Sequence, residues 1–325
     1  MAHIRFYYFF IRQLLLCTIF LVGCAKHDDG SDMDQEIQNG KYPVDAETPY
    51  FQNNSLAAGK KQLRLLAIGN SFSVDALHFV KDILSNMCID STTYSLYALI
   101  HENASLEYWS DMAKKDEIVT LNYMGGEQMA IERTTMLEAL SQDWDVVMLT
   151  QYSFFSTDYN TFNPYLRQLI DFVLSHCANP NVTIAWQMAW SYNDAIVTPD
   201  SNYARWLYIA IATKKMKTND GIDVIVPIGT AIQNARNTPL NSISQLTRDG
   251  WHLNEGKGRY IAACTVVQSL FGQVYDISVD NESTIISLPK ASTQMFPPEG
   301  VSEEERNLCH QCVLNAVEQP FKVVK

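Results

Sequence analysis

Three residues in two distant segments carry the side chains that nucleophilic catalysis requires: Ser71, Asp249 and His252. A serine needs a base to become a nucleophile, and the base needs a carboxylate to orient it. Asp249 and His252 are separated by two residues in a turn that contains Gly250, so the carboxylate can fold back onto one ring nitrogen of His252. The other ring nitrogen is then left to face Ser71. The two segments together predict a Ser-His-Asp triad.

The segment around Ser71 also has a simpler interpretation. It joins an apolar run to a helical pattern, and serine is a frequent N-cap, so Ser71 or Ser73 could serve only to begin the helix. An isolated Asp-x-x-His is equally common in surface turns. The combination favours catalysis, because one segment opens the globular part of the chain and the other comes near its end.

The two segments, GNSFS and RDGWHL, resemble the SGNH branch of the GDSL hydrolases, which act on ester bonds. The resemblance extends over about residues 62–272. It is closest to a branch found in exported lipoproteins, which shares WDVV before a Gln, GTAIQNAR and GRYIAAC. The resemblance implies the SGNH hydrolase fold, a flavodoxin-like α/β/α sandwich with a parallel, doubly wound sheet. It also implies Ser71 as nucleophile, His252 as base and Asp249 as the partner of that base.

The chain departs from this superfamily at the residues that stabilise the oxyanion. In this superfamily, the second sequence motif contributes a glycine and the third contributes an asparagine. This chain has Asn103 near the place of the glycine and Gln151 at the place of the asparagine. We expect the oxyanion hole to combine the backbone N–H of Ser71 with the Gln151 amide and with Asn103 or the backbone beside it. The alternative is that Gln151 only ties loops together.

Apolar runs alternate with helical patterns, and this alternation predicts the framework that positions the candidate residues. The predicted strands cover residues 63–68, 92–100, 144–151, 182–188 and 223–228. The predicted helices cover residues 75–87, 134–140, 162–177, 202–217, 260–271 and 302–317. A possible hairpin covers residues 117–123 and 128–133. The pattern indicates a parallel sheet with helices on both faces. Because parallel strands end at one edge, Ser71, Gln151, Gln187 and Gly229 should gather there.

Residues 1–24 have the form of a lipoprotein signal peptide. Arg5 and Arg12 precede an apolar core, Leu14–Val22, that is too short to span a bilayer. Small residues directly before Cys24 resemble a lipobox, in which this cysteine becomes the lipidated first residue. A plain signal peptide with an incidental cysteine is the alternative. We expect an exported lipoprotein of the outer membrane or cell surface.

Residues 25–60 are polar and aperiodic, which is typical of a tether, and residues 61–325 then suit one hydrolase domain with a C-terminal helix. Removing residues 1–24 takes the formal net charge from −12 to −14. This charge disfavours nucleic acid and anionic lipid as partners, so we expect membrane contact only through the lipid anchor. A lone C-x-x-C at Cys309 and Cys312 favours helix packing with an optional disulfide. We assign no metal and no cofactor.

Four aromatic residues near the predicted strand ends could face a substrate: Trp186, Trp190, Tyr192 and Trp251. Aromatic faces suit stacking on sugar rings, although aromatic residues in strands are more often core. We expect an acylated small molecule or glycan as substrate, with hydrolysis of short acyl esters, foremost acetyl. The alternative is a non-catalytic, glycan-binding surface lipoprotein on the same scaffold, which the replaced glycine favours and the intact triad disfavours.

Overall fold

The computed structural model describes residues 56, 61–124, 130–196, 201–284 and 299–324. The chain divides into two units, and every described residue belongs to the second, Glu47–Lys325. The predicted signal peptide, the predicted lipidation site Cys24 and all but Leu56 of the predicted tether lie outside the described residues. Within the described part of the chain, no helix is both long and apolar enough to cross a bilayer.

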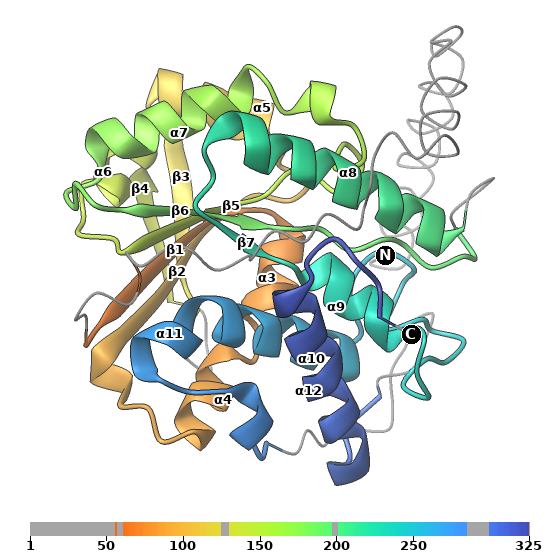
Figure 1. Cartoon of the computed structure of the whole chain (residues 1–325). Helices are drawn as coiled ribbons and strands as arrows, with labels where there is room; N and C mark the ends of the chain where they lie inside the picture. The colour runs from red at the N-terminus through yellow and green to blue at the C-terminus, as the bar shows by residue number, and fades with distance from the viewer. Residues whose placement is uncertain (1–55, 57–60, 125–129, 197–200, 285–298, 325) are drawn as a thin grey trace, which may run out of the picture. The chain divides into compact units, whose positions relative to one another are not determined.

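The described residues form a seven-stranded sheet in the order β4-β3-β2-β1-β5-β6-β7 (Figure 1). Its strands are β1 (Leu63–Gly69), β2 (Tyr94–Ile100), β3 (Ile118–Tyr123), β4 (Ala130–Thr135), β5 (Val146–Leu149), β6 (Thr183–Gln187) and β7 (Val224–Val226). The strands β2, β1, β5, β6 and β7, in this order, are each parallel to their neighbours. The hairpin of β3 and β4 pairs with β2 and forms an antiparallel edge of the sheet. The parallel strands follow the flavodoxin-like order, in which ligands bind beyond the carboxyl ends where the order reverses beside β1.

Helices cover both faces of the sheet (Figure 1). One layer consists of α5 (Leu106–Lys115), α6 (Met136–Leu140), α7 (Tyr165–His176) and α8 (Asn202–Asp220). The other consists of α3 (Ser71–Leu77), α4 (Val80–Asn86), α9 (Ile228–Ala235), α10 (Lys257–Val266), α11 (Gly272–Tyr275) and α12 (Glu303–Glu318). This is a mixed α/β sandwich, as the sequence predicts.

Strand β1 lies in the middle of the sheet and contributes to both hydrophobic cores. Leu63, Leu65 and Ala67 pack with the α10 layer, whereas Leu66 and Ile68 pack with the α7 layer. Successive side chains of a strand point to opposite faces, so an apolar run is the pattern that a strand covered on both faces requires. Each fully buried leucine stabilises the fold by about 1.5–3 kcal/mol. β1 is therefore a rigid support for the residues that follow it.

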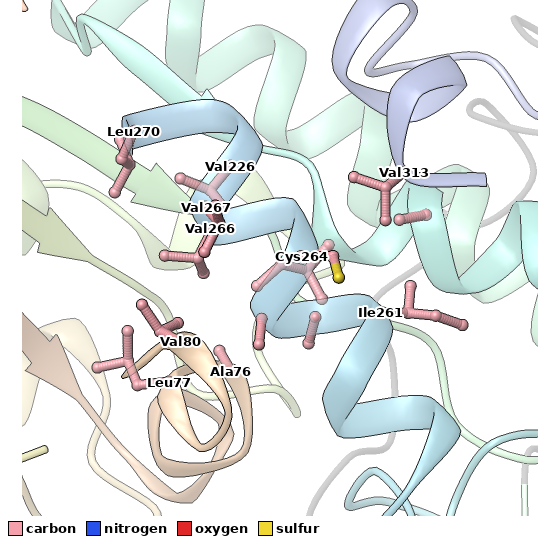
Figure 2. Close-up of a cluster of buried hydrophobic side chains, with 14 of the residues drawn as sticks. Ala76, Leu77, Val80, Val226, Ile261, Cys264, Val266, Val267, Leu270 and Val313 are labelled. Carbon is pink, nitrogen blue, oxygen red and sulfur yellow. The ribbon is translucent and has the colours of Figure 1, made fainter. Parts of the chain in front are cut away.

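The helix after β1 is packed against α10. Ala76 and Leu77 belong to the same buried cluster as Ile261 and Cys264 of α10 and Val226 of β7 (Figure 2). Cys264 is buried and is a free thiol, as are Cys309 and Cys312 of α12. This packing joins two segments that are far apart in the sequence, the one after β1 and the one after the predicted histidine loop.

Each predicted strand is present, including both strands of the hairpin, and the helices differ in three ways. The helix predicted at 75–87 is two helices, α3 and α4, and the one predicted at 260–271 begins at Lys257 and ends in a π-helical turn over Val267–Phe271. Helices α5 and α9 and the four-residue α11 were not predicted. The C-terminal helix α12 begins after Ser302, whose hydroxyl and Glu305 form a capping box.

Candidate active site

Ser71 is the first residue of α3 and lies directly beyond the carboxyl end of β1. The helix is capped by Asn70, whose side chain accepts a hydrogen bond from the N–H of Phe72 at 3.0 Å, so Ser71 is not the cap. The turn is tight: a Cβ on Gly69 would lie 2.9 Å from Thr150 Cγ2. Strand, glycine and cap together present the Ser71 hydroxyl at the edge of the sheet.

Asp249 and His252 occupy a compact turn before α10. Gly250 adopts φ +93°, in the left-handed region that a side chain disfavours. One carboxylate oxygen of Asp249 accepts the N–H of Trp251 at 2.9 Å and that of His252 at 2.7 Å. The turn therefore wraps the backbone around the carboxylate and places the imidazole beside it.

The three predicted catalytic side chains form one hydrogen-bonded chain. His252 Nδ1 lies 2.7 Å from Asp249 Oδ2, and His252 Nε2 lies 2.9 Å from Ser71 Oγ. Ser71 and His252 are partly exposed, so a substrate can reach them. Burial raises the pKa of Asp249, but the hydrogen bonds from His252 and the N–H groups of the turn outweigh it and hold this pKa below its ordinary value. Asp249 is thus an acceptor for an Nδ1–H, which leaves Nε2 free to accept the serine proton.

The segment after β6 supports this turn. The N–H of Asn193 donates to the carbonyl oxygen of Gly250 at 2.9 Å, and the indole N–H of Trp190 donates to that of Trp251 at 2.8 Å. The Trp190 ring stacks on Phe72 with 3.9 Å between centroids. Trp190 therefore connects the histidine turn to the residue after the serine.

The chain enters the turn through two residues in the left-handed region, Gln245 at φ +46° and Leu246 at φ +65°. Such conformations cost about 1–3 kcal/mol each and persist only when their surroundings hold them. Here Arg236 Nε donates to the carbonyl oxygen of Gln245 at 3.1 Å, and the N–H of Asn254 donates to that of Leu246 at 2.8 Å. Arg236 is buried, which lowers its pKa to about 10.

Gln151, predicted as an oxyanion donor, has another role in the structure. Its amide nitrogen donates to the carbonyl and hydroxyl oxygens of Thr161 at 3.1 and 3.3 Å. Its amide oxygen accepts the N–H groups of Leu106 and Tyr152 at 3.0 and 2.8 Å. The side chain is buried and ties together the loops after β2 and β5. This geometry corrects the assignment as a donor and favours the alternative, a tie between loops.

Asn103, the other predicted oxyanion residue, lies exposed in the turn between β2 and α5. Its φ of +57° is in the left-handed region, which glycine adopts without steric cost and in which asparagine is enriched among the other residues. The next residue, Ala104, accepts a hydrogen bond from the side chain of Asn70 at 3.0 Å. Asn103 is therefore held near the beginning of α3, with a glycine-like backbone.

Residues 64–285 match the family described as "Domain of unknown function (DUF4886)". The chain belongs to the DUF4886 family. A solved DUF4886 family protein from Bacteroides uniformis is 24% identical, with a TM-score of 0.68, over 81% of this chain and 97% of that chain. This likeness supports a common fold.

Two further structures are more distant. A protein from Slackia heliotrinireducens, whose description proposes an SGNH hydrolase, is 15% identical with a TM-score of 0.45, over 64% of this chain and 98% of that one. An acetyl xylan esterase is 13% identical with a TM-score of 0.42, over 62% of this chain and 96% of that one. No curated protein matches this DUF4886 chain.

Of the four aromatic residues expected near a substrate, three belong to the core of this DUF4886 protein. Trp186, Trp190 and Tyr192 are buried, whereas Trp251 is 47% exposed directly beside His252. The structure shows a second exposed aromatic group that sequence reasoning missed, on the loop after β5. Its members are the exposed Phe154 and Phe155 and the partly exposed Tyr152, whose ring centroids lie 5.7–6.4 Å apart.

Among the described residues of this DUF4886 chain, one group has the side chains to hold a metal: Cys264, Glu282 and His310, with potential ligand atoms within 4.8 Å of one another. The hydroxyl of Tyr260 lies between two of them, since it donates to Glu282 and lies 2.7 Å from His310 Nε2. A buried hydrogen-bond network accounts for this arrangement, and we assign no metal to it.

An ion cluster that was not predicted from the sequence lies between α3 and the histidine turn. It consists of the buried carboxylate of Asp75 and the partly exposed Arg248 and Arg259. Two signals were present in the sequence. Asp75 lies four residues after Ser71, so a helix places both on one face, and Arg248 directly precedes Asp249.

Proposed function

We propose that this protein is a serine ester hydrolase that removes short acyl groups, foremost acetyl, from glycans. The observation that carries the proposal is the hydrogen-bonded chain from Asp249 through His252 to Ser71. Nucleophile, base and orienting carboxylate are in reach of one another without any rearrangement, which is the geometry that acyl transfer to serine requires.

In the proposed mechanism, His252 Nε2 takes the proton of Ser71 as Oγ attacks the ester carbonyl carbon. The oxyanion of the tetrahedral intermediate accepts hydrogen bonds from the N–H of Ser71, which begins α3, and from Asn103. His252 then gives its proton to the departing alcohol, which leaves an acyl group on Ser71. Water, activated by the same imidazole, releases the acid and restores the serine. Asp249 holds the imidazole in the required tautomer throughout.

The glycan part of the proposal is supported by the exposed aromatic residues at the same edge of the sheet. Trp251 lies next to the base, and Phe154, which is 64% exposed, follows β5, the neighbour of β1. Exposed aromatic faces can stack on the apolar faces of sugar rings.

Release of acetate from acetylated glycans and from p-nitrophenyl acetate by the purified protein tests the function. Ser71-dependent release from both supports it. Glycan binding without acetate release would contradict it and support the non-catalytic alternative.

We also propose that the protein is exported and lipidated at Cys24, on the basis of the sequence of residues 1–24. Cells labelled with a fatty acid should incorporate the label into the wild-type protein and not into Cys24→Ala. Equal labelling of both would contradict the anchor.

A further inference from the structure

Asp75 is a buried carboxylate on the helix that carries Ser71. It lies four residues after the serine in α3, which is one helical turn, and its side chain is 0% exposed. Transferring an ionised carboxylate into the interior costs several kcal/mol, so buried carboxylates have partners. The partners of Asp75 indicate what this carboxylate does.

Three residues supply these partners. Arg248 Nη1 donates to both oxygens of Asp75, at 2.9 and 3.0 Å. Arg259, from α10, donates to one oxygen through Nε at 2.8 Å and places Nη2 at 2.8 Å from it. The backbone N–H of Leu253 donates to the other oxygen at 2.9 Å. Charge-assisted hydrogen bonds of this kind are the strong ones, so the carboxylate is firmly held.

Two of these partners bracket the catalytic turn. Arg248 directly precedes Asp249, and Leu253 directly follows His252. The turn is closed on itself as well, because the N–H of Arg248 donates to the carbonyl oxygen of His252 at 2.9 Å and its guanidinium donates to the carbonyl oxygen of Leu253. Both ends of the turn are therefore bound to a single carboxylate on the helix of the nucleophile.

We propose that Asp75 is a positioning residue that holds His252 at hydrogen-bonding distance from Ser71. The inference rests on the proposed esterase function. A general base must lie within about 2.6–3.2 Å of the proton it abstracts. A displacement of about 1 Å can cost about 10²-fold in rate. Since Asp75 acts on the distance between base and nucleophile and does not touch the substrate, its contribution belongs to kcat.

Asp75→Asn keeps the size of the side chain and removes its charge. We expect kcat for p-nitrophenyl acetate to fall about 10²-fold with little change in KM. In a His252→Ala background the same substitution should lower kcat only slightly further, because Asp75 acts through the imidazole. An equal fold-loss in both backgrounds would overturn the proposal, since it would show a loss of folded protein.

Two arginine variants test the same proposal if Asp75→Asn does not fold. Arg248→Gln and Arg259→Gln each remove one guanidinium from Asp75, but Arg248 also holds the turn at Leu253. We expect Arg248→Gln to lower kcat more than Arg259→Gln, and equal losses would overturn the proposal. Glu305→Gln is the matched control, because it breaks the 2.7 Å ion pair with Lys257 and should leave kcat unchanged.

Proton NMR tests the positioning without any substrate. The imidazole proton shared between His252 and Asp249 should give a downfield resonance in the wild type and in Glu305→Gln, and a weakened one in Asp75→Asn and Arg248→Gln. A resonance unaltered in both cluster variants would overturn the inference. A wild-type protein that has the resonance but hydrolyses no ester would contradict the proposed function alone.

Discussion

His252 Nε2 lies 2.9 Å from the hydroxyl oxygen of Ser71, although 181 positions of sequence separate the two residues. They meet because α3, which begins at Ser71, packs against α10, which follows the histidine turn. The contact places the imidazole nitrogen within hydrogen-bonding distance of the hydroxyl whose proton it would take. This relationship makes the role of each member testable by single substitutions.

Ser71→Ala should abolish ester hydrolysis and leave the fold intact. The serine lies at a turn and is partly exposed, so its hydroxyl is not part of the core. We expect kcat to fall by about 10⁴-fold or more and the free energy of unfolding to change by less than about 0.5 kcal/mol. Assays with p-nitrophenyl acetate and denaturant titrations measure the two quantities. Activity above a few per cent of wild type would exclude Ser71 as the nucleophile.

Asp249→Asn should slow hydrolysis by about 10²- to 10⁴-fold, because asparagine can present an N–H to Nδ1 and reverse the tautomer of His252. The lowered pKa of Asp249 keeps it a carboxylate well into the acidic range. A general base must be neutral to accept the serine proton, so wild-type kcat/KM should fall towards low pH. A pH profile of kcat/KM checks this, and an acid limb that is flat, or an Asn variant as fast as wild type, would count against the triad.

The fold and the proximity of Ser71, Asp249 and His252 could be predicted from the sequence for a physical reason. Central parallel strands are covered on both faces, so the apolar run of β1 and the WDVV run of β5 are visible without any structure. The direction of the sheet then places Ser71 and Gln151 at one edge. Asp249 and His252 are close in sequence, so their contact depends only on a local turn.

What could not be predicted depends on contacts between distant segments. Gln151 has the same chemical groups as an oxyanion donor, and only its bonds to Thr161 and Leu106 show that they are already used. Trp190 and Trp251 look alike in sequence, yet one is buried and the other exposed. Helix α5 has its apolar residues at helical spacing, but it is short and directly follows a polar turn, so the sequence around it is also typical of a loop.

Asn103→Gly tests the remaining oxyanion residue. Glycine adopts the φ of +57° without strain and keeps the backbone N–H, so the substitution removes only the side-chain amide. If that amide is the donor, kcat should fall about 10²- to 10³-fold with little change in KM, because the bond forms fully only in the transition state. An unchanged kcat would assign the donor to the backbone.

Gln151→Ala is the companion experiment, and we expect a different signature. The substitution leaves the buried N–H of Leu106 unpaired, so the free energy of unfolding should fall by about 1–3 kcal/mol. The effect on kcat should be much smaller than that of losing an oxyanion donor. A loss of 10²-fold or more in kcat at unchanged stability would restore Gln151 to the oxyanion hole.

Trp251→Ala should separate glycan binding from chemistry. The indole is exposed beside His252, and its removal takes away a stacking surface but none of the hydrogen bonds that Asp249 makes with the backbone and imidazole. We expect KM for an acetylated glycan to rise while both constants for p-nitrophenyl acetate stay near wild type. Phe154→Ala provides the same comparison on the loop after β5. Parallel losses on both substrates would show that Trp251 supports the turn and does not bind sugar.

Glu282 makes the stability of the protein depend on pH through the network around Tyr260. Burial alone would raise the pKa of this carboxyl, but hydrogen bonds from His310, Thr284 and Tyr260 lower it from 4.5 to about 2. A group with a depressed folded pKa contributes stability that is present above its unfolded pKa and is lost as pH falls through the folded one. The shift corresponds to about 3 kcal/mol, of which about 2 kcal/mol should be lost between about pH 6 and about pH 3.

Glu282→Gln should therefore lower the free energy of unfolding more at about pH 6 than at about pH 3, by a difference of about 2 kcal/mol. Urea titrations at the two pH values measure it. Glu318→Gln, at an exposed position near the end of α12, should show no such difference and serves as the control. An equal effect of Glu282→Gln at both pH values would mean that the carboxylate is not ionised in the folded protein at neutral pH. The Tyr260 hydroxyl would then have to accept a hydrogen bond from Glu282 in place of donating one.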